Sequence, residues 1–125
     1  MAETPKVPNP PPRLTPRASA FWRDVLAVYV LDLTEMQLLR EACSLLSEID
    51  DLRAALSKVG VTVEGSTGQR RVNPAVGEIR QHRLALARVL KALDLPDTGA
   101  DAARTDPRVS ELARYAANQR WNKEA

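Results

Sequence analysis

The sequence predicts a mainly α-helical fold in which a helical hairpin forms the core and a short β-hairpin connects its two long helices. Three observations support this prediction. Apolar residues recur at intervals of three and four over three long stretches. Proline follows a capping residue at the start of two of them. A short segment rich in β-branched residues separates the second stretch from the third. An N-terminal helix and a tethered C-terminal helix complete the predicted chain.

The chain begins with a proline-rich arm over residues 1–14, which we expect to be a flexible, extended lead-in. Thr15 and Pro16 then form a helix start, since a hydroxyl can cap the first turn and proline suits the first helical position. This helix should run to about Val30. Its aromatic residues share one face and are expected to anchor the core or an interface: Phe21, Trp22 and Tyr29.

The second predicted helix begins at Thr34, with Gln37 at the capping-box position, and ends before Gly60. It is long enough to be a packing spine. Its single cysteine has no partner for an internal disulfide and is expected to be a core residue. The apolar positions of this helix recur at three and four: Leu39, Ala42, Cys43, Leu46, Ile49, Leu52, Leu56 and Val59.

Residues 61–72 are expected to form the β-hairpin around a Gly-Ser-Thr-Gly turn. Asn73 and Pro74 then restart a helix that reaches about Leu95. After a linker, a fourth short helix is expected over residues 106–122, and it could either dock on a partner or fold back on its own core. The apolar residues that would bind a partner are Val109, Leu112 and Tyr115.

The chain of 125 residues, 44% hydrophobic and 27% charged, has the composition of one soluble globular domain. We divide it into the arm of residues 1–14, a helical domain over residues 15–96, and a linker with a docking helix over residues 97–125. A chain of this size has a thin core, so association with other copies could be part of its stability. Because it has one cysteine and no apolar run of transmembrane length, we expect a cytoplasmic protein that contacts no membrane.

Charge is unevenly distributed, although the formal net charge is only +2. Residues 34–58 are net acidic, whereas residues 70–91 are strongly basic. These opposite charges could pair the two helices, or pair one copy with the next. Alternatively, the basic residues form a surface that contacts the phosphates of a polyanion. The candidate DNA-binding residues are Arg70, Arg71, Arg80, Arg83, Arg88 and Lys91.

The sequence offers little for catalysis. His82 is the only histidine and is expected to be a solvated surface residue. Glu48, Asp50 and Asp51 point in different directions around a helix, so we expect a solvated face. The glycine-rich turn lacks the Gly-Lys-Ser/Thr ending of a phosphate-binding loop. We therefore predict that the protein is not an enzyme and has no catalytic residues, no metal site and no cofactor.

Several short segments follow one another in a specific order over roughly residues 8–96. They are Pro12–Pro16, Trp22, Leu33–Glu35, Ala42–Cys43, Gly60–Val63, Gly68, Val72–Ala75 and Lys91–Leu95. In this order they resemble the P27-like family of bacteriophage small terminase subunits. The strongest element is Gly68 followed by Asn73-Pro74-Ala75 and an amphipathic helix. The chain departs from the family pattern at Gln37, Asp94 and Pro96-Asp97.

The resemblance implies a non-enzymatic DNA-packaging protein of the host bacterial cytoplasm. Its subunits would form a homo-oligomeric ring, bind double-stranded viral DNA, and recruit and regulate a large terminase subunit that carries the ATPase and the nuclease. The sequence contains no evident recognition-helix signature, so DNA contact by shape and charge is expected. The alternative from a different class is a helical protein-interaction adaptor with no nucleic-acid role.

Overall fold

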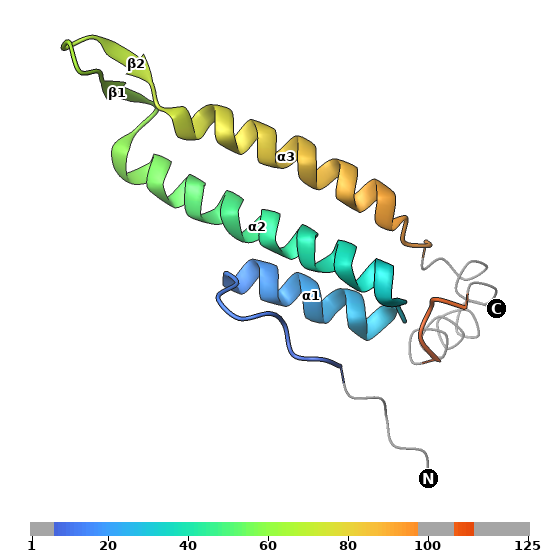
Figure 1. The fold of residues 1–125 in the computed structure, drawn as a ribbon. Coiled ribbons are helices and arrows are strands. Elements are labelled where there is room, and N and C mark those ends of the chain that lie inside the picture. The colour runs from blue at the N-terminus through green and yellow to red at the C-terminus, as the bar shows by residue number, and fades with distance from the viewer. Residues whose placement is uncertain (1–6, 98–106, 112–125) are drawn as a thin grey trace, which may run out of the picture.

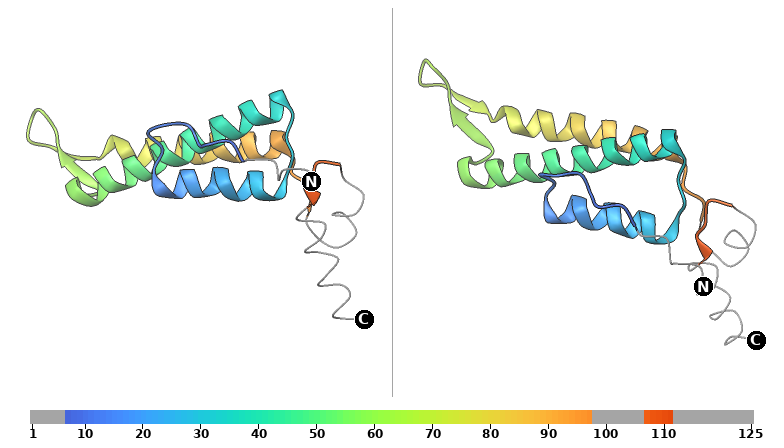
Figure 2. Two further views of the ribbon diagram at one scale, coloured as in Figure 1. Left: turned by 90° about the horizontal axis from the view of Figure 1, so that it is seen from below. Right: turned by 60° about the horizontal axis from the view of Figure 1, so that its bottom comes forward.

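The computed structural model describes residues 7–97 and 107–111, and α2 is its central element (Figure 1). α3 lies along one side of α2, α1 lies along another side of its N-terminal half, and the β-hairpin projects from the far end (Figures 1 and 2). The predicted mainly helical fold with a short antiparallel hairpin is confirmed. The elements are α1 (Pro16–Val28), α2 (Leu33–Val59), β1 (Thr62–Glu64), β2 (Arg70–Val72) and α3 (Pro74–Leu93).

Trp22 of α1 is at the centre of the core. Its side chain is 1% exposed, and its Nε1 donates a hydrogen bond to the carbonyl oxygen of Pro8 at 2.9 Å. The indole is therefore buried without an unpaired donor, which would otherwise be costly. Leu14 also packs against this cluster. The predicted flexible arm therefore contacts the core at Pro8 and Leu14. The other buried members of the cluster are Ala18, Val25, Leu39 and Cys43.

Cys43 is a core residue, as the sequence predicts. Its side chain is fully buried in the face of α2 that receives α1. Burial raises the pKa of its thiol to about 11, because the thiolate would lose its hydration. The thiol is therefore protonated at neutral pH and contributes as a small apolar side chain rather than as a nucleophile.

The start of α1 is fixed to the middle of α2 by polar contacts. The backbone N–H of Thr15 donates to Ser47 Oγ at 3.0 Å, and Thr15 Oγ1 donates to Asp50 Oδ2 at 2.6 Å. Arg17 Nη2 lies 2.8 Å from Asp50 Oδ1. The prediction that the Thr15 hydroxyl caps α1 is wrong, because this hydroxyl binds Asp50 instead. The prediction that Asp50 is solvated is also wrong, since it joins the two helices.

The capping box of α2 lies two residues before the predicted one. The Glu35 N–H donates to Asp32 Oδ1 at 2.8 Å, and the Asp32 N–H donates to Glu35 Oε1 at 3.1 Å. The prediction of a box at Thr34 and Gln37 is therefore wrong. Both pairs have the required spacing, but two carboxylates at the positive end of the helix dipole are better placed than a hydroxyl and an amide.

Asn73 joins the β-hairpin to the helical pair. Its Nδ2 donates to the carbonyl oxygen of Gly60 at 3.0 Å, while its Oδ1 accepts from the N–H of Ala75 at 3.0 Å. It therefore caps α3, as predicted, and also holds the end of α2. Gly60 has a φ of 97°, a left-handed value that glycine adopts without strain, and it ends α2 as predicted.

Replacing Asp50 with Asn should destabilise the protein in a pH-dependent way. Burial raises the pKa of Asp50, but hydrogen bonds from Thr15 and Arg17 and the charges of Arg17 and Arg53 outweigh burial and leave this pKa below 3.8. A carboxyl group whose pKa is lowered by folding stabilises the protein above its unfolded pKa, and the effect is lost as the pH falls through the folded value. We expect Asp50→Asn to cost about 1–2 kcal/mol at pH 7.

Urea unfolding of the variant and of the wild-type protein, followed from pH 7 to pH 2, measures this effect. The difference between the two proteins should shrink as the pH falls below 3.8. Asp24→Asn is the matched control, because Asp24 is exposed and has no ion pair among the described residues. A difference that stays constant across this pH range would contradict the role assigned to the Asp50 charge.

Replacing Asp94 with Gly should stabilise the protein. Asp94 ends α3 with φ 47° and ψ 58°, in the left-handed region. A side chain there is strained, and a carboxylate at the C-terminal end of a helix opposes the helix dipole. Asp94→Gly should raise the free energy of unfolding by about 0.5–1 kcal/mol, measured by urea denaturation. Asp94→Ala is the control. If both variants stabilise equally, the backbone conformation is not the cause.

Candidate nucleic-acid interface

The six candidate DNA-binding residues lie on β2 and α3, and all six are exposed. None of them forms a salt bridge or a side-chain hydrogen bond with another residue in the part of the chain that the structure describes. Their positive charge is therefore not neutralised by direct contact with a carboxylate. Such a surface attracts polyanions.

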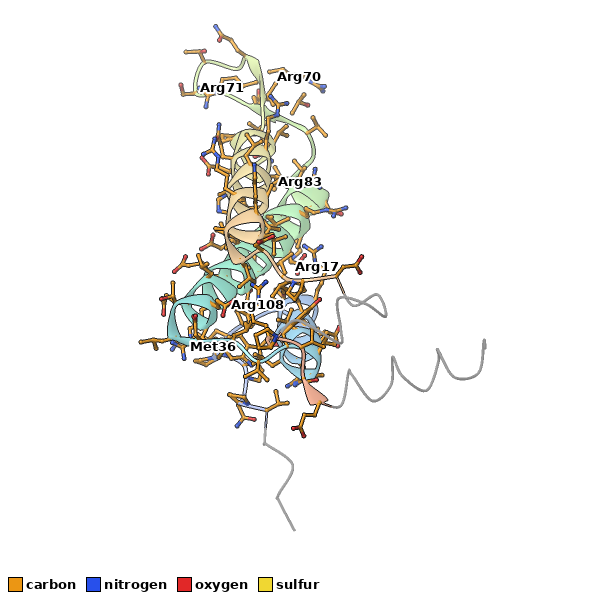
Figure 3. All side chains as sticks on the ribbon, turned by 90° about the vertical axis from the view of Figure 1, so that its right-hand side faces the viewer. Arg17, Met36, Arg70, Arg71, Arg83 and Arg108 are labelled. Atoms are coloured by element: carbon orange, nitrogen blue, oxygen red, sulfur yellow. The ribbon has the colours of Figure 1, made fainter. Side chains whose placement is uncertain are left out.

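The two hairpin arginines extend to opposite sides of the ribbon (Figure 3). This follows from the alternation of successive strand residues. Arg70 stands opposite Glu64 in the strand register. The Arg71 side chain passes over Gly65, where an added Cβ would lie 3.2 Å from Arg71 Cδ. The six cations therefore do not all lie along one side, and only one hairpin arginine can extend toward any one surface.

The cations of α3 occupy different sides of the helix. Ile79 and Leu93 are buried and mark the side of α3 that faces the core. At 100° per residue, Arg80, Arg83 and Lys91 lie to one side of it, while Arg88 lies roughly opposite to it. Arg83 is visible on the side of the helical pair in Figure 3. The basic surface thus continues around α3 rather than following one straight line.

Arg80 and Arg83 meet Arg53 of α2 at a pocket of about 410 Å³ between the two helices. Ile79 at its floor is 6% exposed, whereas Leu84 is 51% exposed. None of the three arginines has a salt bridge or side-chain hydrogen bond with a described residue. We name this pocket the arginine groove. It is lined by Arg53, Leu56, Val76, Ile79, Arg80, Arg83 and Leu84.

Arg53 was not among the predicted site residues. Arg53 lies in a net acidic stretch of sequence, so the sequence alone does not group it with the basic residues 70–91. The packing of α2 against α3 brings it beside the two α3 arginines. The sequence signal that could have found it is its position around α2, between the apolar residues Leu46, which packs toward α1, and Leu56, which lies toward α3.

His82 is only partly solvated, because it also contacts α2. Its side chain is 22% exposed, and its Nε2 lies 2.9 Å from Glu48 Oε2 of α2. Its Nδ1 lies 2.7 Å from the carbonyl oxygen of Glu78. This histidine is the residue of α3 that pairs with an α2 carboxylate in the described part of the chain. The arginines and lysine of α3 form no such pair, so they do not hold the two helices together.

The second predicted site lies near the C-terminal end of the described residues. Val109 is 2% exposed and forms an isolated β-bridge with Tyr29. The Ser110 N–H donates to the Val28 carbonyl oxygen at 2.6 Å. The prediction that a helix begins at Pro107 is wrong, because residues 107–110 form a turn and this bridge. Leu112 and Tyr115 lie outside the described residues.

Arg108 ties this segment to both long helices. Its Nη1 lies 3.2 Å from Glu35 Oε2 near the start of α2 and donates to the Asp94 carbonyl oxygen at the end of α3, at 2.9 Å. Tyr29 Oη also donates to the Pro96 carbonyl oxygen at 2.7 Å. These contacts and the burial of Val109 make residues 107–110 part of the chain's own core. Val109 is therefore not available to a partner in this structure.

The residues that the structure describes contain no group of three or more His, Cys, Asp or Glu placed to hold a metal ion. Within the same residues, no helix has the length and apolar character needed to cross a membrane. The sequence matches no family model, and neither a curated protein nor a solved structure matches it. A functional assignment therefore rests on the geometry described above and on the resemblance found in the sequence.

Two truncations test the role of residues 107–110. Ending the chain after Glu111 keeps Val109 and the Arg108 contacts, so this chain should melt at a higher temperature than one that ends after Leu95. Ending it after Leu95 removes the buried Val109 and the Arg108 contacts, and should cost at least about 2 kcal/mol of stability. Thermal unfolding followed by circular dichroism measures both. If the two truncated chains melt at the same temperature, this segment does not stabilise the core.

Proposed function

We propose that the protein is the small terminase subunit of a bacteriophage DNA-packaging machine. It binds double-stranded viral DNA as a homo-oligomeric ring, and it recruits and regulates a large subunit that carries the ATPase and the nuclease. The proposal is supported by the resemblance of residues 8–96 to the P27-like family. It is also supported by the exposed cations of the β-hairpin and α3.

The single observation that carries DNA binding is that none of these cations forms a salt bridge with another described residue. Arg70 and Arg71 stand on a ribbon that projects beyond the helices (Figures 1 and 3). Arg88 and Lys91 are exposed residues of α3. Phosphate oxygens can reach such side chains without displacing a carboxylate. Binding should therefore depend strongly on salt and only weakly on base sequence.

Assembly is supported by apolar side chains exposed at both ends of the helical pair. Leu33 is 86% exposed and lies beside Val30, which is also exposed, at the end where α1 meets α2. Exposed valines surround the base of the β-hairpin at the other end: Val59, Val61 and Val72. Grouped apolar residues on a surface mark contacts with other proteins. A subunit with such residues at both ends is suited to association.

The contact with the large subunit is proposed for residues beyond Glu111. Val109 belongs to the chain's own core, so Leu112 and Tyr115 remain the proposed partner-binding residues. The adaptor alternative is less well supported. It explains the opposite charges of α2 and α3 by pairing between the helices, yet the described α3 arginines and lysine form no ion pair with α2.

Replacing Arg70 and Arg71 together with Gln should weaken binding to a mixed-sequence DNA duplex. The slope of log K against log salt concentration should become shallower by about one, because only one of the two side chains can face the duplex and one phosphate contact is lost. Fluorescence anisotropy with a labelled duplex at several salt concentrations measures this slope. The control replaces Arg23 and Arg40, two exposed arginines of α1 and α2, with Gln. Wild-type affinity and slope in the hairpin variant would exclude the hairpin from the DNA interface.

A further inference from the structure

The arginine groove is formed by the part of α2 and α3 that α1 does not cover. α1 begins at Pro16, and its first turn is fixed to Asp50 by Thr15 and Arg17. Arg53 and Leu56 follow Asp50 along α2 by about one and two turns. The groove therefore begins where α1 begins, and it runs from there toward the β-hairpin.

The chemistry of the groove suits a protein segment better than a DNA backbone. Its floor consists of the apolar side chains of Leu56, Val76 and Ile79, and Leu84 is exposed at its edge. A hydrated phosphate gains nothing from apolar side chains. An apolar centre surrounded by arginines is instead the composition of a protein–protein interface, in which arginine is enriched and often contributes strongly to affinity.

The same chain carries a surface of complementary charge on another side of α2. Glu41, Glu48 and Asp51 are all exposed and are spaced seven and three residues apart, so they follow one side of the helix. We name this surface the acidic stripe, defined by Glu41, Glu48 and Asp51.

The acidic stripe cannot reach the arginine groove of its own copy. Arg53 follows Glu48 by five residues, which places it roughly 140° away around α2. A contact between the two surfaces therefore requires a second copy. Because the two surfaces differ, the contact is heterologous, and repeating it produces a closed ring or an open filament.

We propose that the arginine groove of one copy binds the acidic stripe of the next. Arg80 and Arg83 pair with the Glu41 and Asp51 carboxylates of the stripe, because Glu48 already pairs with His82 of its own copy. The inference rests on the homo-oligomeric part of the proposed function. It assigns Arg80 and Arg83 to subunit contact and leaves the hairpin arginines, Arg88 and Lys91 for DNA.

A charge-swap experiment tests this contact in the full chain without DNA. The groove variant carries Arg80→Glu and Arg83→Glu, and the stripe variant carries Glu41→Arg and Asp51→Arg. Neither pair of residues has an ion pair with a described residue. The control, with Arg23→Glu and Asp24→Arg, makes the same kinds of change at exposed positions of α1. Sedimentation velocity over a range of concentrations measures assembly, and circular dichroism melting checks folding.

Each variant alone should need at least tenfold more protein than the wild type to assemble, because like charges then face each other across the contact. A mixture of the two variants should assemble again, since every groove then finds a stripe of opposite charge on the other variant. The control should assemble as the wild type does. If a charge-reversed variant does not fold, Arg80→Gln with Arg83→Gln replaces it and should weaken assembly in the same direction.

Three results would overturn the inference. Folded variants that assemble like the wild type would exclude this contact while leaving the proposed ring in place. Folded variants that fail to assemble when mixed would show that charge pairing between these two surfaces does not hold the copies together. A wild-type protein that is monomeric at every concentration would overturn both this contact and the ring. DNA binding by that monomer would be tested separately, by the fluorescence anisotropy measurements at several salt concentrations.

Discussion

The carboxylate of Asp50 determines where α1 lies on α2, and much of the remaining structure depends on that position. Thr15 and Arg17 bind its two oxygens, so α1 begins beside the middle of α2 and runs back along its N-terminal half. α1 has 13 residues and α2 has 27. With a rise of 1.5 Å per residue, α1 can cover only roughly half of its partner. The end of the helical pair nearest the β-hairpin is therefore formed by α2 and α3 alone.

This division gives the molecule two parts with different properties. Near Trp22 the core is closed on several sides, because the arm, the α1–α2 connection and residues 107–110 all pack against it. Beyond Asp50, α2 packs only against α3, with Asn73 joining their ends; His82 links the two helices at Glu48, just before this part. The arginine groove and the hairpin cations both belong to this second part. The surfaces available for partners are therefore found where the chain's own core is thinnest.

The sequence predicts the elements well because local signals specify them. The spacing of apolar residues, the left-handed glycine at the end of α2 and the cap before Pro74 act within a few residues, and each appears where expected. Thr15, Asp50, Arg53 and Val109 have roles that no local pattern contains, since their partners are 32 or more residues away or on another helix. The capping box of α2 was misplaced because two overlapping pairs have the required spacing.

The central claim is that the protein forms a homo-oligomer that binds DNA, and that the part of α2 and α3 left uncovered by α1 supplies the surfaces for both. Native mass spectrometry of the full-length wild-type protein, alone and with a short DNA duplex, tests this most directly. The account predicts one closed homo-oligomer as the main species and the mass of that oligomer plus DNA when the duplex is added. A protein that is monomeric in both samples and carries no DNA would contradict it.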